Sequence, residues 1–269
     1  MTASYPPEHH ILRDLRAQAE WVNEDECVFT APVPAEVRTA SGAMALGPLF
    51  AIADLALVTT AIGFAEDDWC GTLDLAIRTR IPIREGPCVV ACELLRVGGT
   101  LITTKAEIRD GNTLAGIAIA TSRRMPRNVD YNSDTPLAKQ VGVVQNWGLP
   151  SSGFSKGIDD QLGLTPHAPG IIELAKTPYV TNSFGTINGG TTGILLCAGA
   201  ESALGGDFVA TDVEVRYTGQ AAEGPVRTMS EVVRVEADHA VVDVTAVDLS
   251  RGRRPIATAG ITLTTTMTP

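Results

Sequence analysis

The sequence lacks any excess of positive charge. Its 269 residues include 21 Lys or Arg against 31 Asp or Glu, which gives a formal net charge of −10 and a pI near 4.9. Nucleic-acid binding depends on clustered basic side chains that neutralise phosphates. We therefore expect neither DNA nor RNA as a partner, and the 44% of hydrophobic residues indicates a globular protein with a substantial core.

Cysteine and histidine are too few and too scattered for a disulfide scaffold or a metal site. The five cysteines include no C-x-x-C pair, and the four histidines show no metal-ligand spacing. His9 and His10 are expected at the surface. The first residues also lack the basic segment and apolar run of a signal peptide. These absences predict a reduced, cytoplasmic protein without a metal or cofactor.

One long hydrophobic run is present, from Ala45 to Ala65, and it is as long as a membrane-spanning helix. Asp54 lies at its centre, where a charge would cost several kcal/mol in lipid. A helix that is apolar on all sides can equally be the buried centre of a globular domain. We expect a core helix and no membrane span.

The chain contains two copies of one pattern. When residues 74–97 are aligned without gaps with residues 212–235, the copies share an Asp, an Arg, an E-G-P triplet, a Glu and an R-V pair at matching positions. In both copies apolar and polar residues alternate on either side of E-G-P, as in two antiparallel strands joined by a turn. An apolar helical stretch precedes each copy and further alternating stretches follow it. The sequence therefore predicts a duplicated α+β protein.

The expected domain organisation follows from this repeat. We predict a leading helix over residues 1–23, an N-terminal unit over 24–125 and a C-terminal unit over 166–269. Residues 126–165 are rich in Pro, Gly, Ser and Asp, which is typical of a linker. The two units would form a covalently fused pseudo-dimer.

A long helix followed by antiparallel strands, entered through a glycine-rich turn, resembles the hotdog fold, in which the sheet wraps around the helix. The turn is most similar to that of PaaI-type acyl-CoA thioesterases, whose motif is approximately N-x-x-G-x-x-H-G-G with an acid nine residues after the His. The second half has Asn182, Gly185 and then Asn188 in place of the His, but Cys197 in place of the acid. The first half lacks the polar turn but has Asp54 in place of the acid.

In that family the active site lies between two hotdog units. The resemblance therefore implies one competent site per chain, in which Asp54 faces the turn formed by Asn182, Asn188 and Gly189. The mirror-related position, built from Cys197 and residues 45–46, would be a relic.

The residues of this predicted site suit thioester hydrolysis. Gly189 would begin a helix, where backbone N–H groups lack intrahelical acceptors and can stabilise an oxyanion. Burial of Asp54 among apolar neighbours would raise its pKa towards neutrality, as suits a general base or nucleophile. Two structural alternatives stay open: Asn188-Gly189 as a hairpin turn, and Asp54 as a cap for a neighbouring turn.

Other polar residues are weaker candidates. Glu201 lies one turn after Cys197 and is either an acid for a second site or a solvated residue near the helix end. Asn182 and Asn188 could orient water or the thioester, or cap the turn. Four arginines are candidate contacts for the phosphates of coenzyme A, although a surface role is the commoner one for any single arginine: Arg78, Arg80, Arg123 and Arg124.

These features predict hydrolysis of an acyl-CoA thioester to the free acid and CoA, at one composite site between the two halves. A non-catalytic acyl-CoA-binding or lipid-binding sensor is the alternative, because His is missing from the motif. An acyl-CoA hydratase or dehydratase is less favoured, since those enzymes use a positioned His and none stands at the turn. A homodimer of double-hotdog chains is a further expectation.

Overall fold

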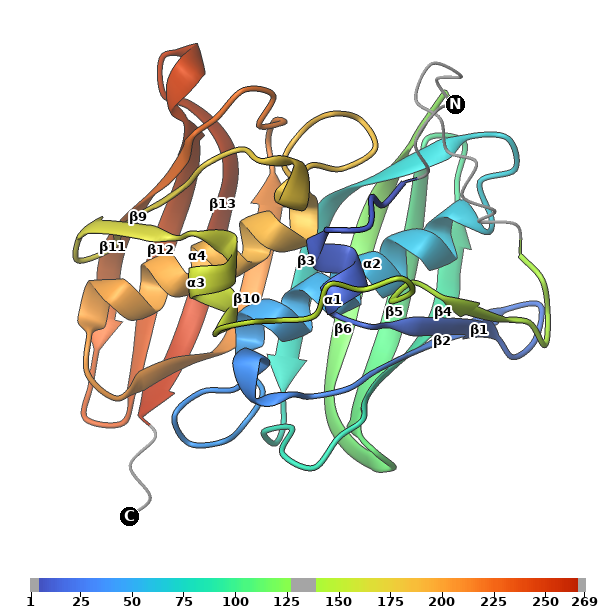
Figure 1. The fold of residues 1–269 in the computed structure, drawn as a ribbon, viewed down its shortest axis with the longest axis horizontal. Coiled ribbons are helices and arrows are strands. Elements are labelled where there is room, and N and C mark those ends of the chain that lie inside the picture. The colour runs from blue at the N-terminus through green and yellow to red at the C-terminus, as the bar shows by residue number, and fades with distance from the viewer. Residues whose placement is uncertain (1–4, 127–138, 266–269) are drawn as a thin grey trace.

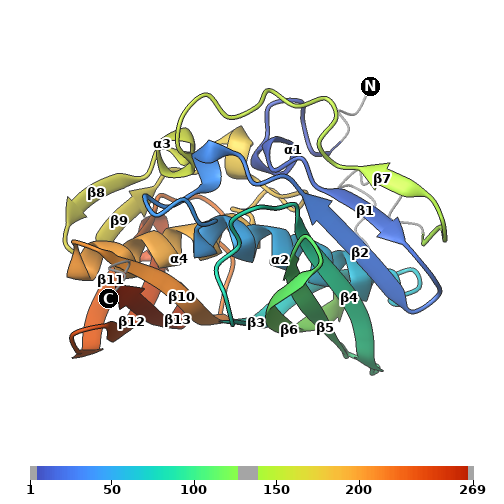
Figure 2. The ribbon, with the colours of Figure 1, turned by 90° about the horizontal axis from the view of Figure 1, so that it is seen from below.

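The computed structural model describes residues 5–126 and 139–265. A 13-stranded antiparallel sheet curves around two long helices, α2 (Leu46–Ile62) and α4 (Gly189–Leu204) (Figures 1 and 2). The first half contributes β1 (Gln18–Trp21), β2 (Glu26–Ala31), β3 (Trp69–Thr79), β4 (Cys88–Val97), β5 (Leu101–Asp110), β6 (Thr113–Met125) and β7 (Val144–Asn146). The second half contributes β8 (Thr165–Ala168), β9 (Ile171–Leu174), β10 (Phe208–Tyr217), β11 (Val226–Val235), β12 (His239–Asp248) and β13 (Arg254–Thr265).

Each half is one hotdog unit. The sheet order is β7-β1-β2-β4-β5-β6-β3 in the first half and β10-β13-β12-β11-β9-β8 in the second. From the central pair β3 and β10 outwards, the six strands of the second half match six strands of the first half in the same order, and β7 is an additional edge strand. The strands bury alternate side chains against their helix because successive residues of a strand point to opposite faces. The predicted α+β fold of two fused hotdog units is confirmed.

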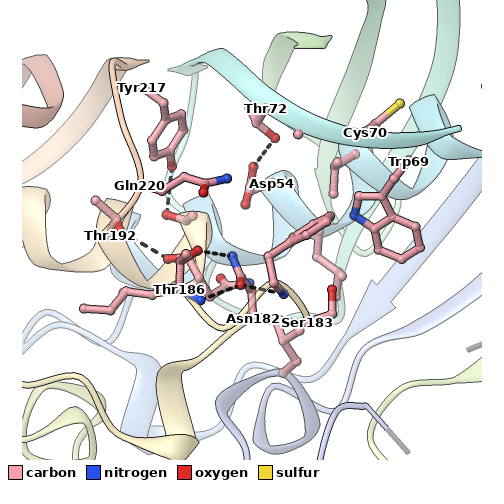
Figure 3. A pocket seen from close by; sticks show the side chains of 18 of the residues that line it. Asp54, Trp69, Cys70, Thr72, Asn182, Ser183, Thr186, Thr192, Tyr217 and Gln220 are labelled. Carbon is pink, nitrogen blue, oxygen red and sulfur yellow. Dashed lines mark hydrogen bonds between the residues drawn. The ribbon is translucent and has the colours of Figure 1, made fainter. Parts of the chain in front are cut away.

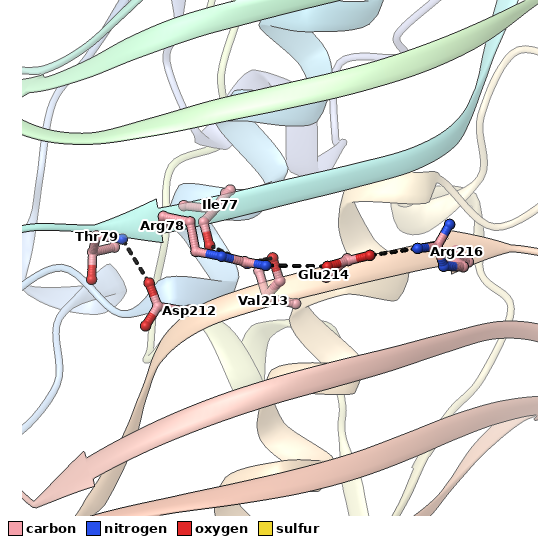
Figure 4. Close-up of polar contacts among 7 residues, drawn as sticks. All are labelled: Ile77, Arg78, Thr79, Asp212, Val213, Glu214 and Arg216. Atoms are coloured by element: carbon pink, nitrogen blue, oxygen red, sulfur yellow. Dashed lines mark hydrogen bonds and ion pairs between the residues drawn. The ribbon is translucent and has the colours of Figure 1, made fainter.

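The two units share one sheet because β3 pairs with β10. Ala76 and Glu214 are aligned in the sequence repeat, and they also pair directly across this seam, so the repeat corresponds to a two-fold arrangement. Side chains reinforce the seam in Figure 4: the Thr79 N–H donates to Asp212 Oδ1 at 2.8 Å, and Arg78 forms an ion pair with Glu214 at 3.1 Å. The central strands therefore fix the halves against each other.

The two long helices touch at their N-terminal halves through small residues. A side chain on Gly193 would overlap the ring of Phe50, and a Cβ on Gly190 would lie 2.9 Å from the Cα of Ala51. A Cβ on Gly47 would likewise lie 3.1 Å from the Cα of Ile194. Glycine is thus required where the helix backbones approach most closely.

The leading segment and the linker lie over the side of α2 and α4 that faces away from the central strands (Figure 2). Within residues 5–23 the leading segment forms a four-residue helix, α1 (Ile11–Asp14), followed by β1, and not the single helix expected over residues 1–23. The linker holds β7 and α3 (Ile158–Leu162). Its part from 127 to 138 lies outside the described residues.

His10 is completely buried, so the predicted surface position is wrong. Its Nδ1 accepts from the N–H of Leu12 at the start of α1, and its Nε2 hydrogen bonds to the carbonyl oxygen of Thr181 at 3.0 Å. Burial lowers the pKa of His10 to about 4, which keeps the ring neutral at physiological pH.

The apolar run that includes α2 forms a buried helix at the centre of the first unit, and Asp54 is 7% exposed within it. Within residues 5–126 and 139–265, no helix has both the length and the apolar character needed to cross a membrane.

The helix contact gives a testable consequence. Gly193→Ala should lower the free energy of unfolding by about 1–3 kcal/mol through overpacking against Phe50, although Ala is a better helix former than Gly by about 1 kcal/mol. Thermal and denaturant unfolding would measure the change. The matched control is Gly260→Ala, since nothing lies within 4 Å of the added Cβ. An unchanged or more stable Gly193→Ala protein would contradict this packing.

Candidate active site

A cavity of ≈ 180 Å³ lies between the two units. One side is formed by α2 and the start of β3 from the first unit, and the other by residues 182–192 and 217–221 from the second. Figure 3 shows Asp54 and Thr72 on one side of this space and Asn182, Thr192 and Tyr217 on the other. Residues from both halves therefore line this cavity.

Asp54 points into the cavity from the middle of α2. Its Oδ1 accepts a hydrogen bond from the Thr72 hydroxyl at 2.8 Å, and its carboxylate also accepts from the backbone N–H of Gly190. Burial raises the pKa of Asp54 to about 6, and these two hydrogen bonds oppose the rise. A carboxylate with this pKa is ionised at neutral pH and remains basic enough to accept a proton.

The N-terminus of α4 offers one free backbone donor to this cavity. Among the described residues, the N–H of Thr191 is bonded to Asn188 Oδ1, that of Thr192 to the Asn188 carbonyl oxygen, and that of Gly190 to Asp54. In the part of the chain that the structure describes, no acceptor is found for the Gly189 N–H at the start of this helix. A Cβ on Gly189 would lie 3.0 Å from Asp54 Oδ2, so a side chain at this position would crowd the Asp54 carboxylate.

The two asparagines of the motif hold the turn in shape. Asn188 caps α4, and its side chain also hydrogen bonds to Tyr5. Asn182 Oδ1 accepts from the N–H groups of Phe184 and Thr186, while its Nδ2 donates to Thr186 Oγ1 at 2.8 Å. Both line the cavity, yet these bonds engage their polar atoms within the protein. The Asn-Gly pair begins a helix, so the hairpin alternative is wrong.

Several polar residues of the cavity were not identified from the sequence, among them Thr72, Tyr217 and Gln220. Thr72 holds Asp54, and the Tyr217 hydroxyl donates to the Gly189 carbonyl oxygen at 2.8 Å. Gln220 projects its amide between Tyr217 and Asp54 in Figure 3. The available signal was a difference between the repeats, because Tyr217 and Gln220 align with a Thr and a Pro in the first copy.

Apolar residues continue the cavity along α2 beyond Asp54. Val58 and Ile62 follow on successive turns of the helix, and Trp69 and Met125 lie beside them at the start of β3 and the end of β6. The Trp69 ring contacts Phe184 of the second unit edge to face, at 5.7 Å between centroids. This part of the cavity suits an apolar group.

The mirror-related position forms a separate cavity of ≈ 520 Å³ without the same chemistry. Leu46 occupies the place of Gly189, and Thr79 that of Tyr217. Cys197 stands in the place of Asp54, is buried, and does not line this cavity. Among the described residues that line it, the positions equivalent to Asp54 and Tyr217 thus supply neither a carboxylate nor a phenol, and the carboxylate of Asp212 accepts from the Thr79 N–H.

Glu201 lies outside both cavities. Its Oε1 accepts from the backbone N–H of Ala210 at 2.9 Å, so it tethers the end of α4 to β10. Burial raises the pKa of Glu201 to about 7, and this hydrogen bond opposes the rise. The geometry favours a structural role over that of a second-site acid.

The four candidate arginines are spread over the sheet. Arg78 pairs with Glu214 at the seam (Figure 4), and Arg80 lines the mirror-related cavity. Arg124 binds Asp68 and the Ala65 carbonyl oxygen after α2. Arg123 is exposed on β6. None of the four lines the cavity that contains Asp54.

No group of three or more His, Cys, Asp or Glu side chains that could hold a metal ion occurs in the described part of the chain. The residues that line this cavity include a carboxylate, amides and hydroxyls.

Solved structures of other proteins share this fold. A 12:0-ACP thioesterase from Umbellularia californica matches with a TM-score of 0.60 and 10% identity over 89% of this chain and 94% of that one. The tesB protein of Mycobacterium avium subsp. paratuberculosis matches with a TM-score of 0.57 and 15% identity over 93% and 96%. A hotdog-fold protein from Alicyclobacillus acidocaldarius matches with a TM-score of 0.57 and 8% identity over 97% and 99%.

No protein-family model matches the sequence, and no curated protein matches it. At such low identities the structural likeness shows the fold. The class defined by this fold is the double-hotdog proteins, in which two hotdog units follow each other in a single chain.

The structural role of Glu201 can be tested through stability. Because its folded pKa is raised from 4.5 to about 7, its contribution to stability is full below pH ~4.5 and is lost as pH rises through 7. Glu201→Gln keeps the acceptor for Ala210 and cannot ionise. Its unfolding free energy should exceed that of the parent by up to about 3 kcal/mol at pH 8 and by little at pH 4.5.

Chemical denaturation across this pH range would measure the difference, with the exposed Glu85→Gln as control. A stability gain that does not grow with pH would contradict this account of Glu201.

Proposed function

We propose that this protein hydrolyses an acyl-CoA thioester at the cavity between its two units. The observation that carries the proposal is the pairing of Asp54, a buried carboxylate with a raised pKa, with the unoccupied N–H of Gly189 on the facing helix terminus. The named function of the Umbellularia thioesterase with the same fold supports the reaction class. Coenzyme A as the thiol part comes from the likeness of the sequence motif.

The geometry supports a direct attack by water. The thioester carbonyl oxygen would accept a hydrogen bond from Gly189 N–H, at the positive end of the α4 dipole. A water held by Asp54 and the Gln220 amide would attack the carbonyl carbon while Asp54 takes its proton. Collapse of the tetrahedral intermediate breaks the C–S bond, and the proton on Asp54 passes to the leaving thiolate. The products are the free acid and the thiol.

The residues around this pair have positioning roles in the proposed reaction. Thr72 orients the Asp54 carboxylate through its hydroxyl. Tyr217 and Asn188 hold the first turn of α4, so that Gly189 N–H keeps its direction. Thiolates leave readily, because a thiol pKa is near ~8.5. The site therefore requires no separate strong acid.

The test is thiol release from acyl-CoAs by the purified protein and its Asp54→Asn variant. Loss of the base should lower kcat by about 10²- to 10⁴-fold, while a non-hydrolysable acyl-CoA analogue should still bind. Release that is unaffected by the substitution would contradict the role of Asp54. Binding of the analogue without any thiol release by the parent would favour the non-catalytic sensor.

The pH dependence gives an independent prediction. Because the reaction needs the Asp54 carboxylate, kcat/KM should rise with pH through an inflection at about 6. Thr72→Val removes a hydrogen bond that favours the charged form, so the inflection should move to higher pH. The pH–rate profiles of both proteins with one acyl-CoA would measure the shift. An inflection that stays in place or moves to lower pH would contradict this arrangement.

A further inference from the structure

The leading segment contributes to the cavity between the two units. We define residues 5–16 as the leading strap. Tyr5 lines the cavity and hydrogen bonds to the Asn188 side chain. Farther along the strap, His10 hydrogen bonds to the Thr181 carbonyl oxygen, and Leu12 lines the same cavity. The strap thus follows the loop that leads into α4.

Buried polar bonds hold the strap in place. Asp14, which is 1% exposed, accepts from the Tyr179 hydroxyl at 2.9 Å. The same carboxylate accepts from the hydroxyls of Ser151 and Ser152 and from the N–H of Gly153 in the linker. Four donors on one buried carboxylate tie strap, linker and second unit together. The linker adds Trp147 to the lining of the cavity.

The mirror-related cavity provides an internal comparison. The lining of the Asp54 cavity includes Tyr5, Leu12 and Trp147, and its volume is ≈ 180 Å³. Among the described residues, none from the strap or from the linker lines the mirror-related cavity, whose volume is ≈ 520 Å³. Residues from the leading strap and the linker therefore line the smaller of these two cavities.

The volume points to a class of substrate. A cavity of about 150 Å³ in another protein holds a benzene molecule, so a cavity of ≈ 180 Å³ takes an acyl group of similar size. Its walls beyond Asp54 are apolar, with Val58, Ile62 and Trp69. We propose that the strap makes Tyr5 and Leu12 specificity-determining residues that restrict this site to compact acyl groups, either short chains or a single aromatic ring. This inference rests on the proposed function.

The chain offers a matched pair of variants. Ile11 and Leu12 are neighbours in α1 and are 1% and 3% exposed, but only Leu12 lines the cavity. Leu12→Ala and Ile11→Ala remove comparable apolar contacts from the strap, so they separate loss of the cavity wall from loss of strap packing. Tyr5→Ala and Tyr5→Phe separate the bulk of the ring from the hydrogen bond to Asn188.

The experiment compares kcat/KM for acetyl-, butyryl-, hexanoyl-, octanoyl-, dodecanoyl- and phenylacetyl-CoA. The parent should prefer the compact acyl groups. Leu12→Ala and Tyr5→Ala should raise the ratio of dodecanoyl to hexanoyl turnover by about tenfold or more, whereas Ile11→Ala and Tyr5→Phe should leave it unchanged. A parent that prefers dodecanoyl-CoA, or an equal shift in Ile11→Ala, would overturn the inference.

Binding separates this inference from the proposed hydrolysis. Calorimetry with the non-hydrolysable hexyl and dodecyl thioethers of CoA applies the same comparison without turnover. The parent should bind the dodecyl compound more weakly than the hexyl compound, and Leu12→Ala and Tyr5→Ala should reduce this difference. That result would support the role of Tyr5 and Leu12 in selecting the acyl group even if none of the proteins releases thiol. Equal affinity of the parent for both compounds would overturn the inference about Tyr5 and Leu12, even if the parent hydrolyses acyl-CoAs.

Discussion

The close approach of α2 and α4 is the constraint on which the site depends. Asp54 and Gly189 belong to different units, and each lies one turn or less from the residues where the helices touch. Larger residues in place of Gly190 or Gly193 would separate the backbones. The acid would then move away from the helix terminus that it faces. The small residues at the helix contact thus keep the Asp54 carboxylate close to the N-terminus of α4.

The seam of the sheet and the helix contact act together. β3 and β10 hold the units side by side, and Thr72, which fixes the Asp54 carboxylate, belongs to β3. Tyr217, at the end of β10, fixes the first turn of α4. Each seam strand therefore supports one of the two groups that face each other. Rigid support of this kind is what a preorganised site requires.

Duplication followed by divergence explains why the two cavities differ. A two-fold arrangement would place an acid and a glycine turn in each cavity, but each copy retains only one of these features. The retained features meet in one cavity because each such cavity takes its helix acid from one unit and its turn from the other. Keeping a carboxylate buried is unfavourable for folding at neutral pH, and a cysteine in the mirror-related position avoids that cost.

Much of the fold and part of the site could be predicted from the sequence. The repeat, the alternating strands and the apolar helix can be read directly from the sequence, and they led to the two units. The facing of Asp54 and Gly189 was an implication of the resemblance to hotdog thioesterases, and its role in a reaction stays a prediction. The strap could not be predicted, since His10 and Asp14 form buried hydrogen bonds with residues far along the chain. Gln220 was missed for the same reason, because its place opposite Asp54 depends on how the two units meet.

The most direct test of the composite site is a crystal structure with an acyl-CoA analogue in which a methylene group replaces the thioester sulfur. The account predicts the ketone oxygen within hydrogen-bond distance of Gly189 N–H, with Asp54 and Gln220 on the side from which water would attack. The acyl group should lie beneath the leading strap. An analogue bound in the mirror-related cavity, or with its carbonyl turned away from Gly189, would contradict the account.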